Sequence, residues 1–145
     1  MTDIQEMLIA QEGTGPYKDG RFFPYEDSVG KLTIGYGHNL TDKGLTLDVV
    51  FMQLNADIAD ALDDVRHNYS CYDNLSRPRQ LVLLSMAFNL GRDGLAKFIR
   101  FSGAVHRGDW EEAAAQIENS KAAIQAPARY KELARMMRDD VSQWI

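Results

Sequence analysis

Residues 45–66 carry the feature that most restricts the possible folds, an apolar stripe that repeats every third or fourth position with acidic residues around it. This spacing predicts one long amphipathic helix. Its length suits a connector between two lobes, which we place at about residues 46–67. The acidic residues contain no interleaved His or Cys and no calcium-loop spacing, so we expect a solvated face and no metal site. The stripe consists of Val50, Leu54, Ile58, Leu62 and Val65.

The parts of the chain on either side of this helix have different patterns. Before it, a loop-rich segment with several glycines and prolines leads into alternating residues from Leu32 to Gly37, which predict a short strand. After it, the chain is almost entirely helical in pattern. We therefore expect an α+β fold that is mostly α, with a small β-hairpin lobe over about residues 14–45. A larger helical lobe is expected over about 76–145, and an N-terminal helix over 3–12 is expected to belong to this lobe.

Composition and charge exclude several classes of protein. The chain has 145 residues, 45% apolar and 26% charged, and a net charge of −5. Residues 1–73 carry 5 basic and 13 acidic side chains (−8), and residues 74–145 carry 11 and 8 (+3). The basic second half indicates either an anionic partner or simply an unequally charged surface. A lone cysteine, Cys71, excludes an internal disulfide, and we expect neither a secretory signal nor membrane insertion.

Glu12 is the first candidate site residue. It shares a helix face with Ile4 and Leu8, and Gly13 is placed to end that helix. At a core-facing position in the last turn, burial and the helix C-terminus would both disfavour the charged carboxylate, as a general acid requires. The alternative is a carboxylate that points into water at a frayed helix end.

Asp27 and Thr33 are the next candidates, because they flank the turn that leads into the predicted strand. Thr33 lies on the strand face that otherwise carries only Gly35 and Gly37, and such a bare face allows a ligand or another backbone to approach closely. Two acids and a hydroxyl, brought together by a helix end and a hairpin, form the layout of a glycosidase site.

The pattern formed by these residues resembles that of the phage lysozymes, or endolysins, of glycoside hydrolase family 24. The family pattern is E-G, a loop, and then Y-x-D-x-x-G-x-x-T-x-G-x-G-H, and residues 25–38 meet each of its positions. Weaker likeness continues through residues 85–91 and 110–114. The resemblance implies a lysozyme-like fold with an active-site cleft between the two lobes, and it implies no cofactor.

The resemblance also implies roles for the three candidates. Glu12 would protonate the leaving oxygen of the β-1,4 bond between N-acetylmuramic acid and N-acetylglucosamine. Asp27 would stabilise positive charge at the sugar, and Thr33 would position the attacking water. Inversion at the anomeric carbon, and therefore wide separation of the two carboxyl groups, is expected.

Five further residues are assigned near the site. His38, Gly35 and Gly37 are expected to be structural, with His38 a satisfied polar group. Phe88 and Asn39 match positions that contact saccharide, although spacing alone would place Phe88 in the core and the side-chain type at Asn39 differs from the family.

The loop between Glu12 and Asp27 is longer than in the best-known phage member of the family. It contains a second Tyr-x-Asp tripeptide that ends at Asp19. We choose Asp27 as the site residue because Gly30, Thr33 and Gly35 follow it at the family spacing.

The partners implied by the resemblance are bacterial peptidoglycan and a holin-type membrane protein for release, with no nucleic acid and a monomeric state. Synthesis in a host cytoplasm and action on the cell wall in the periplasm are expected. Two alternatives stay open: a lytic transglycosylase acting on the same bond, which needs one acid and no water-holding partner, and a non-catalytic module that binds the wall or nucleic acid through the basic half.

Overall fold

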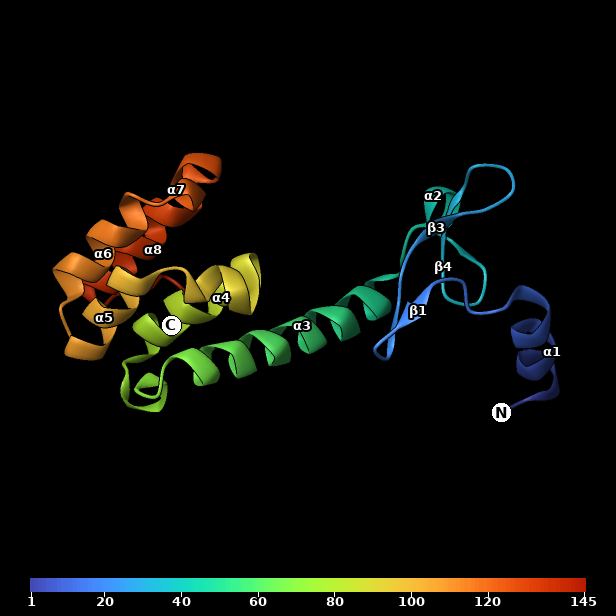
Figure 1. Ribbon diagram of the computed structural model, residues 1–145, viewed down its shortest axis with the longest axis horizontal. Helices are drawn as coiled ribbons and strands as arrows, with labels where there is room; N and C mark the ends of the chain where they lie inside the picture. The colour runs from blue at the N-terminus through green and yellow to red at the C-terminus, as the bar shows by residue number, and fades with distance from the viewer. The chain divides into compact units, whose positions relative to one another are not determined.

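A single long helix, α3, spans Leu47–Asn68 in the computed structural model, which describes residues 1–145 (Figure 1). The apolar stripe therefore predicts this helix to within two residues at each end. The chain divides into two compact units, Met1–Met52 and Gln53–Ile145, and α3 continues from the first into the second. The expected cleft between lobes, and the grouping of helix 3–12 with the helical lobe, stay predictions.

Short antiparallel strands and two helices form the first unit, to which helix α1 (Asp3–Glu12) belongs. Thr2 caps α1 in a reciprocal capping box with Gln5. Strands β1 (Tyr17–Lys18) and β2 (Arg21–Phe22) form one hairpin. Strands β3 (Tyr25–Glu26), β4 (Leu32–Ile34) and β5 (His38–Asn39) form a second sheet in the order β3-β4-β5, and helix α2 (Leu40–Lys43) follows it.

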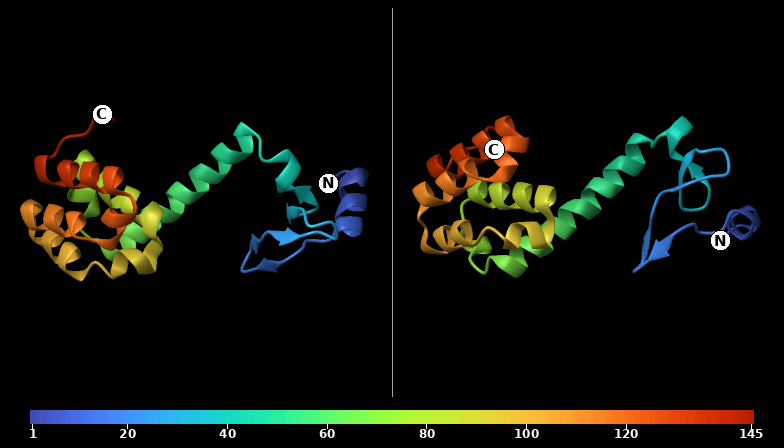
Figure 2. Two further views of the ribbon diagram at one scale, coloured as in Figure 1. Left: turned by 90° about the horizontal axis from the view of Figure 1, so that it is seen from above. Right: turned by 45° about the horizontal axis from the view of Figure 1, so that its top comes forward.

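Helices α4 to α8 gather in the second unit around one apolar core (Figure 2). Ser76 precedes α4 and Pro78 occupies its first turn, where a missing N–H is tolerated. The helices span Arg77–Ala96 (α4), Ile99–Arg107 (α5), Trp110–Glu118 (α6), Lys121–Gln125 (α7) and Pro127–Asp139 (α8), after a short 3-10 turn at Tyr72–Asn74. None of the helices combines the length and apolar character needed to cross a membrane.

The apolar core lies wholly in the second unit. Every buried apolar side chain falls between Ala61 and Met137, and the largest of them include Tyr69, Phe101 and Tyr130. In the first unit, Thr33 is the single buried residue. The fold is therefore α+β and mostly α, as predicted. Its first unit is ordered by turns and backbone hydrogen bonds more than by an apolar core.

Candidate active site

Glu12 is the last residue of α1, as the sequence predicts. Gly13 follows with φ +68°, and its N–H donates to the carbonyl of Ile9 at 3.0 Å, which ends the helix. Helix α1 buries none of its residues, and Glu12 is exposed. The expectation that Glu12 faces the core is therefore wrong for this unit, because the strands beside α1 provide no apolar core against which it could pack.

Glu12 instead rests against the backbone of Gly37. A Cβ atom at Gly37 would lie 2.7 Å from Oε2 of Glu12 and 2.9 Å from its Cδ atom, closer than real Cβ contacts come. Gly37 also has φ +78°, a conformation that L side chains rarely adopt. Gly37 thus has two reasons to be glycine, and the nearer one is the carboxylate of the candidate acid. Gly35, with φ +62° and nothing within 4 Å of an added Cβ, is required only by the turn.

Asp27 is fixed at the start of the turn between β3 and β4. Its Oδ1 atom accepts hydrogen bonds from the N–H groups of Val29 (3.0 Å) and Lys31 (2.8 Å), and its own N–H donates to the carbonyl of Lys31 at 2.9 Å. Its second carboxylate oxygen has no hydrogen bond within the protein. Asp27 is half-buried. One oxygen is therefore used to hold the group in place, and the other is free to interact with a ligand.

Thr33 lies in β4 and is anchored on the same residue as Asp27, namely Lys31. Its hydroxyl donates to the carbonyl of Lys31 at 3.0 Å, and in the sheet it pairs with Tyr25 on one side and Asn39 on the other. Thr33 is only 4% exposed, whereas its neighbour Leu32 is 43% exposed. The alternation along the strand was predicted, but the face that carries the threonine is the covered one.

His38 and Asn39 have local hydrogen-bond partners. A ring nitrogen of His38, Nε2, lies 2.6 Å from the carbonyl oxygen of Gly44, which agrees with the expected satisfied polar group. Asn39 caps α2: its Oδ1 accepts from the N–H of Asp42, and its Nδ2 donates to the Asp42 carboxylate, both at 3.0 Å. A capping asparagine followed three residues later by an acidic residue is a recognisable helix start, and this signal was missed. Saccharide contact by Asn39 stays a prediction.

The second Tyr-x-Asp tripeptide has a purely local explanation. Asp19 and Gly20 form the two-residue turn between β1 and β2, with φ +52° and +77°, and the flanking Lys18 and Arg21 are paired. Two positive φ values are what a type I′ hairpin turn requires, and Asp-Gly is a favoured pair there. Asp19 therefore occupies a turn position, and the Asp-Gly dipeptide was the signal that could have revealed this hairpin.

Phe88 lies in the second unit, on α4, and is 45% exposed. The interpretation based on spacing alone, which places it in the core, is therefore wrong. Phe88 lines a shallow hollow of about 300 Å³ together with Gly91 and three aspartates of α3, Asp57, Asp60 and Asp64. An exposed aromatic ring in a hollow suits contact with a ligand, as the resemblance implies for this position.

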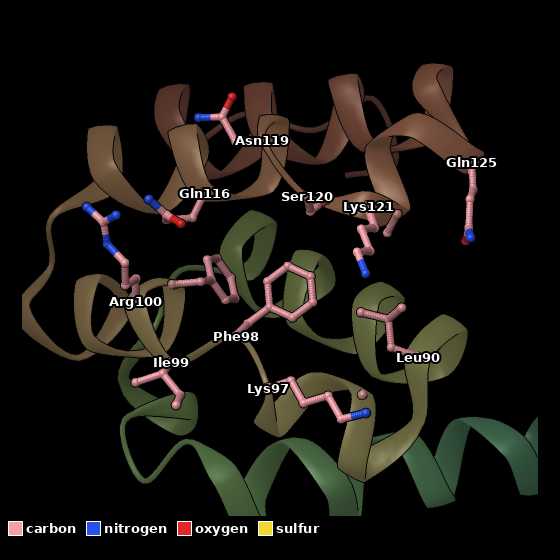
Figure 3. A pocket seen from close by; sticks show the side chains of 13 residues that line it. Leu90, Lys97, Phe98, Ile99, Arg100, Gln116, Asn119, Ser120, Lys121 and Gln125 are labelled. Carbon is pink, nitrogen blue, oxygen red and sulfur yellow. The ribbon is translucent and has the colours of Figure 1, made fainter.

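A second hollow in this unit, of about 490 Å³, combines an apolar floor with a basic rim (Figure 3). Phe98 and Leu90 are among the apolar residues that line it, and the charged residues that line it are Lys97, Arg100 and Lys121. No carboxylate lines this hollow. Arg100 is paired with Glu112 at 3.2 Å, whereas Lys97 and Lys121 are exposed and form no ion pair. Part of the positive charge of the second half is therefore concentrated here.

Comparison with known proteins finds one family model that covers most of the chain. The family model described as phage lysozyme matches residues 18–135, a range that contains Asp27, Thr33 and Phe88 and begins after Glu12. A protein named probable T4-type lysozyme 2, from Dictyostelium discoideum, is 24% identical over 158 residues, which cover 89% of each chain. The pre-baseplate central spike protein Gp5 of Enterobacteria phage T4 is 27% identical over 138 residues, covering 76% of this chain and 23% of that protein.

Proposed function

This chain belongs to the phage lysozyme family, and we propose that it hydrolyses the β-1,4 bond between N-acetylmuramic acid and N-acetylglucosamine in bacterial peptidoglycan. The family match and the T4-type relative make it a lysozyme-type hydrolase. The bond, the mechanism and the role in lysing a bacterial host are the finer parts of the proposal.

In the proposed mechanism, Glu12 donates a proton to the leaving glycosidic oxygen, and Asp27 stabilises the positive charge that develops on the sugar. The carboxylate of Glu12 is exposed and can therefore be reached by a substrate. The burial that a general acid requires must then come from the bound substrate, which excludes water from the carboxylate. The unbonded oxygen of Asp27 supports its charge-stabilising role, since Oδ1 alone holds the group in position.

Thr33 is proposed to position the attacking water. Its hydroxyl hydrogen is used by Lys31, and its oxygen keeps the capacity to accept a hydrogen bond. Because Thr33 is 4% exposed, the water would have to enter the covered side of the sheet to reach it. Since the backbone of Lys31 also holds Asp27, a movement of this residue would displace both groups together. Shared anchoring of this kind favours one fixed arrangement of carboxylate and hydroxyl, as catalysis by positioning requires.

The anchors of the two acids support an inverting reaction. Asp27 is held at Lys31, immediately before β4, and Glu12 rests on Gly37, beyond the other end of β4. A strand of three residues spans roughly 10 Å. Attachment at opposite ends of the strand favours the wide carboxyl separation that leaves room for a water molecule opposite the leaving group.

One observation carries the proposal: in the first unit the carboxylate of Asp27 is held by the backbone of Lys31, and the carboxylate of Glu12 lies close to the backbone of Gly37. The test is a wall-clearing assay on purified peptidoglycan with Glu12→Gln and, as a matched control, Glu6→Gln on the same exposed helix. We expect Glu12→Gln to lower the clearing rate by about 100-fold or more and Glu6→Gln to leave it unchanged. Equal activity of the two variants would contradict the proposal.

Product analysis separates this proposal from the transglycosylase alternative. Hydrolysis leaves a reducing N-acetylmuramic acid end, whereas a transglycosylase leaves anhydromuramic ends. Anhydro products alone would overturn the assignment of a water-holding role to Asp27 and Thr33.

We also propose that a holin-type membrane protein releases the enzyme to the wall, which is tested by comparing lysis of expressing cells with and without a membrane-permeabilising agent.

A further inference from the structure

The inserted hairpin β1–β2 presents an aromatic face. Tyr17 pairs directly with Phe22, and Lys18 pairs with Arg21. Directly opposed residues of an antiparallel pair share one face of the ribbon, and neighbouring residues point to opposite faces. The hairpin therefore carries two aromatic rings on one face and two basic side chains on the other. Its open end is closed by the N–H of Phe23, which donates to the carbonyl of Pro16 at 2.9 Å.

The aromatic face continues beyond the hairpin to Tyr36. The ring centroids of Tyr17 and Phe22 are 5.0 Å apart, and those of Phe22 and Tyr36 are 5.5 Å apart, both pairs in edge-to-face contact. The three residues are 56%, 36% and 47% exposed in chain order. Three rings thus form a row that is held together by its own contacts while much of its surface stays open to solvent.

Tyr36 connects this row to the candidate acid. It directly precedes Gly37, the residue against which the carboxylate of Glu12 rests. Tyr36 also lines a hollow with Leu8 and Ile9 of α1, the helix that ends at Glu12. The ring row therefore begins beside that helix and runs through Phe22 to Tyr17. The basic residues Lys18 and Arg21 lie on the other face of the hairpin, so the row itself is uncharged.

Resting on the proposed lysozyme function, we propose that Tyr17, Phe22 and Tyr36 form a sugar-stacking platform that binds pyranose rings of the glycan strand beyond the cleaved bond. The face of a pyranose ring is a set of C–H groups, which carry partial positive charge and pack against the negative face of an aromatic ring. A neutral row of separate rings suits the uncharged ring faces of an extended glycan. The platform would give this chain a preference for long strands.

The test measures binding in the absence of turnover. The full chain carrying Glu12→Gln is titrated with a long N-acetylglucosamine oligomer and with the disaccharide, by calorimetry. Adding Tyr17→Ala should weaken binding of the long oligomer by roughly two- to tenfold and leave binding of the disaccharide unchanged. Tyr17→Phe keeps the ring and should keep the affinity. Phe23→Ala is the matched control, because Phe23 is 45% exposed but lies outside the ring row.

A second measurement covers the possibility that Tyr17→Ala disorders the hairpin. Tyr17→Trp keeps an aromatic ring and adds a fluorophore at the end of the row, and its emission should change on addition of the long oligomer but not of the disaccharide. Oligomer affinity that is the same with Tyr17→Ala as without it, or an unchanged tryptophan emission, would overturn the platform. The platform would also be overturned if Tyr17→Ala weakened only self-association or binding to lipid vesicles and left oligomer binding unchanged.

These outcomes are independent of the proposed hydrolysis. A wild-type chain that clears peptidoglycan while Tyr17→Ala leaves oligomer binding unchanged would refute the platform and keep the enzyme. A chain that binds the oligomer through Tyr17 but releases no reducing ends from the wall would keep the platform and refute the hydrolysis.

Discussion

The carboxylate of Glu12 occupies the space beside Gly37 into which a side chain would extend, so that a Cβ at this position would be 2.7 Å from Oε2. The contact joins the end of helix α1 to the turn between β4 and β5, two segments 25 positions apart in the sequence (37 − 12). In a unit with no apolar core, the bare backbone of Gly37 leaves room for the carboxylate at this place.

Gly37→Ala should therefore lower wall-clearing activity strongly while it lowers the free energy of unfolding only slightly. The new Cβ displaces the Glu12 carboxylate, and the positive φ adds a cost of about 1 kcal/mol. The control is Gly108→Ala in the second unit, where φ is +71° and the nearest atom to an added Cβ, in Trp110, is 3.6 Å away. Both variants should lose similar free energy of unfolding in urea. Only Gly37→Ala should lose wall-clearing activity, by roughly tenfold or more.

The two aspartates of the long loop should behave differently when each is changed to asparagine. Asp27→Asn removes the charge while keeping an oxygen that can accept from Val29 and Lys31, so we expect a loss of about 100-fold or more in clearing rate with little change in stability. Asp19→Asn should be nearly neutral, since asparagine adopts the positive φ of a type I′ turn readily. The reverse order of activities would show that the assignment of Asp27 through the inserted loop is wrong.

Attachment to cell walls should weaken as salt is added, because the basic rim of the second unit would attract an anionic wall over roughly one Debye length. Replacing both Lys97 and Lys121 by glutamine should lower the amount bound at low salt several-fold, at roughly 0.2–1 kcal/mol for each charge, and flatten the salt dependence. Lys131→Gln, an exposed lysine of α8 outside this hollow, is the control. Sedimentation with purified walls measures the bound fraction, and attachment that ignores salt would refute the role of charge.

Alkaline pH should destabilise the second unit. Burial raises the pKa of the Tyr69, Tyr130 and Cys71 side chains above their ordinary values of 10.0, 10.0 and 9.0. A raised pKa in the folded state gives a stability contribution that is complete below the unfolded value and is lost as the pH rises toward the folded value. The free energy of unfolding should therefore fall from about pH 9 upward.

Tyr69→Phe tests this dependence at one residue. The Tyr69 hydroxyl is buried near Ser102 but makes no hydrogen bond of normal geometry, so its removal should leave stability at pH 7 unchanged or raise it by up to about 1 kcal/mol. The alkaline loss should become shallower in this variant. Tyr17→Phe, which changes an exposed tyrosine, should follow the wild type. Urea titrations at neutral and alkaline pH compare the three proteins, and a Tyr69→Phe variant less stable at pH 7 would show that the hydroxyl has a partner.

Local patterns along the chain were enough to predict α3, the end of α1 at Glu12 and the class of the fold, whereas the short helix α2 with its Asn39 cap was missed. The stripe of α3, the capping box of α1 and Pro127 at the start of α8 are local patterns, and each depends on contacts between residues a few positions apart. The order of the motif from Tyr25 to His38 is likewise enough to indicate the family, because fixed residues at fixed spacing encode one turn and one strand.

Tertiary structure alone decided which sides of these elements are buried and which side chain lies against Gly37. Whether Thr33 or Leu32 is buried depends on what packs over the sheet, and alternation along a strand is the same for both choices. The exposure of Phe88 and the seat of Glu12 on Gly37 likewise depend on contacts between segments far apart in sequence. Spacing within a segment reports its own periodicity, whereas burial and close approach are set by the neighbours that folding brings to it.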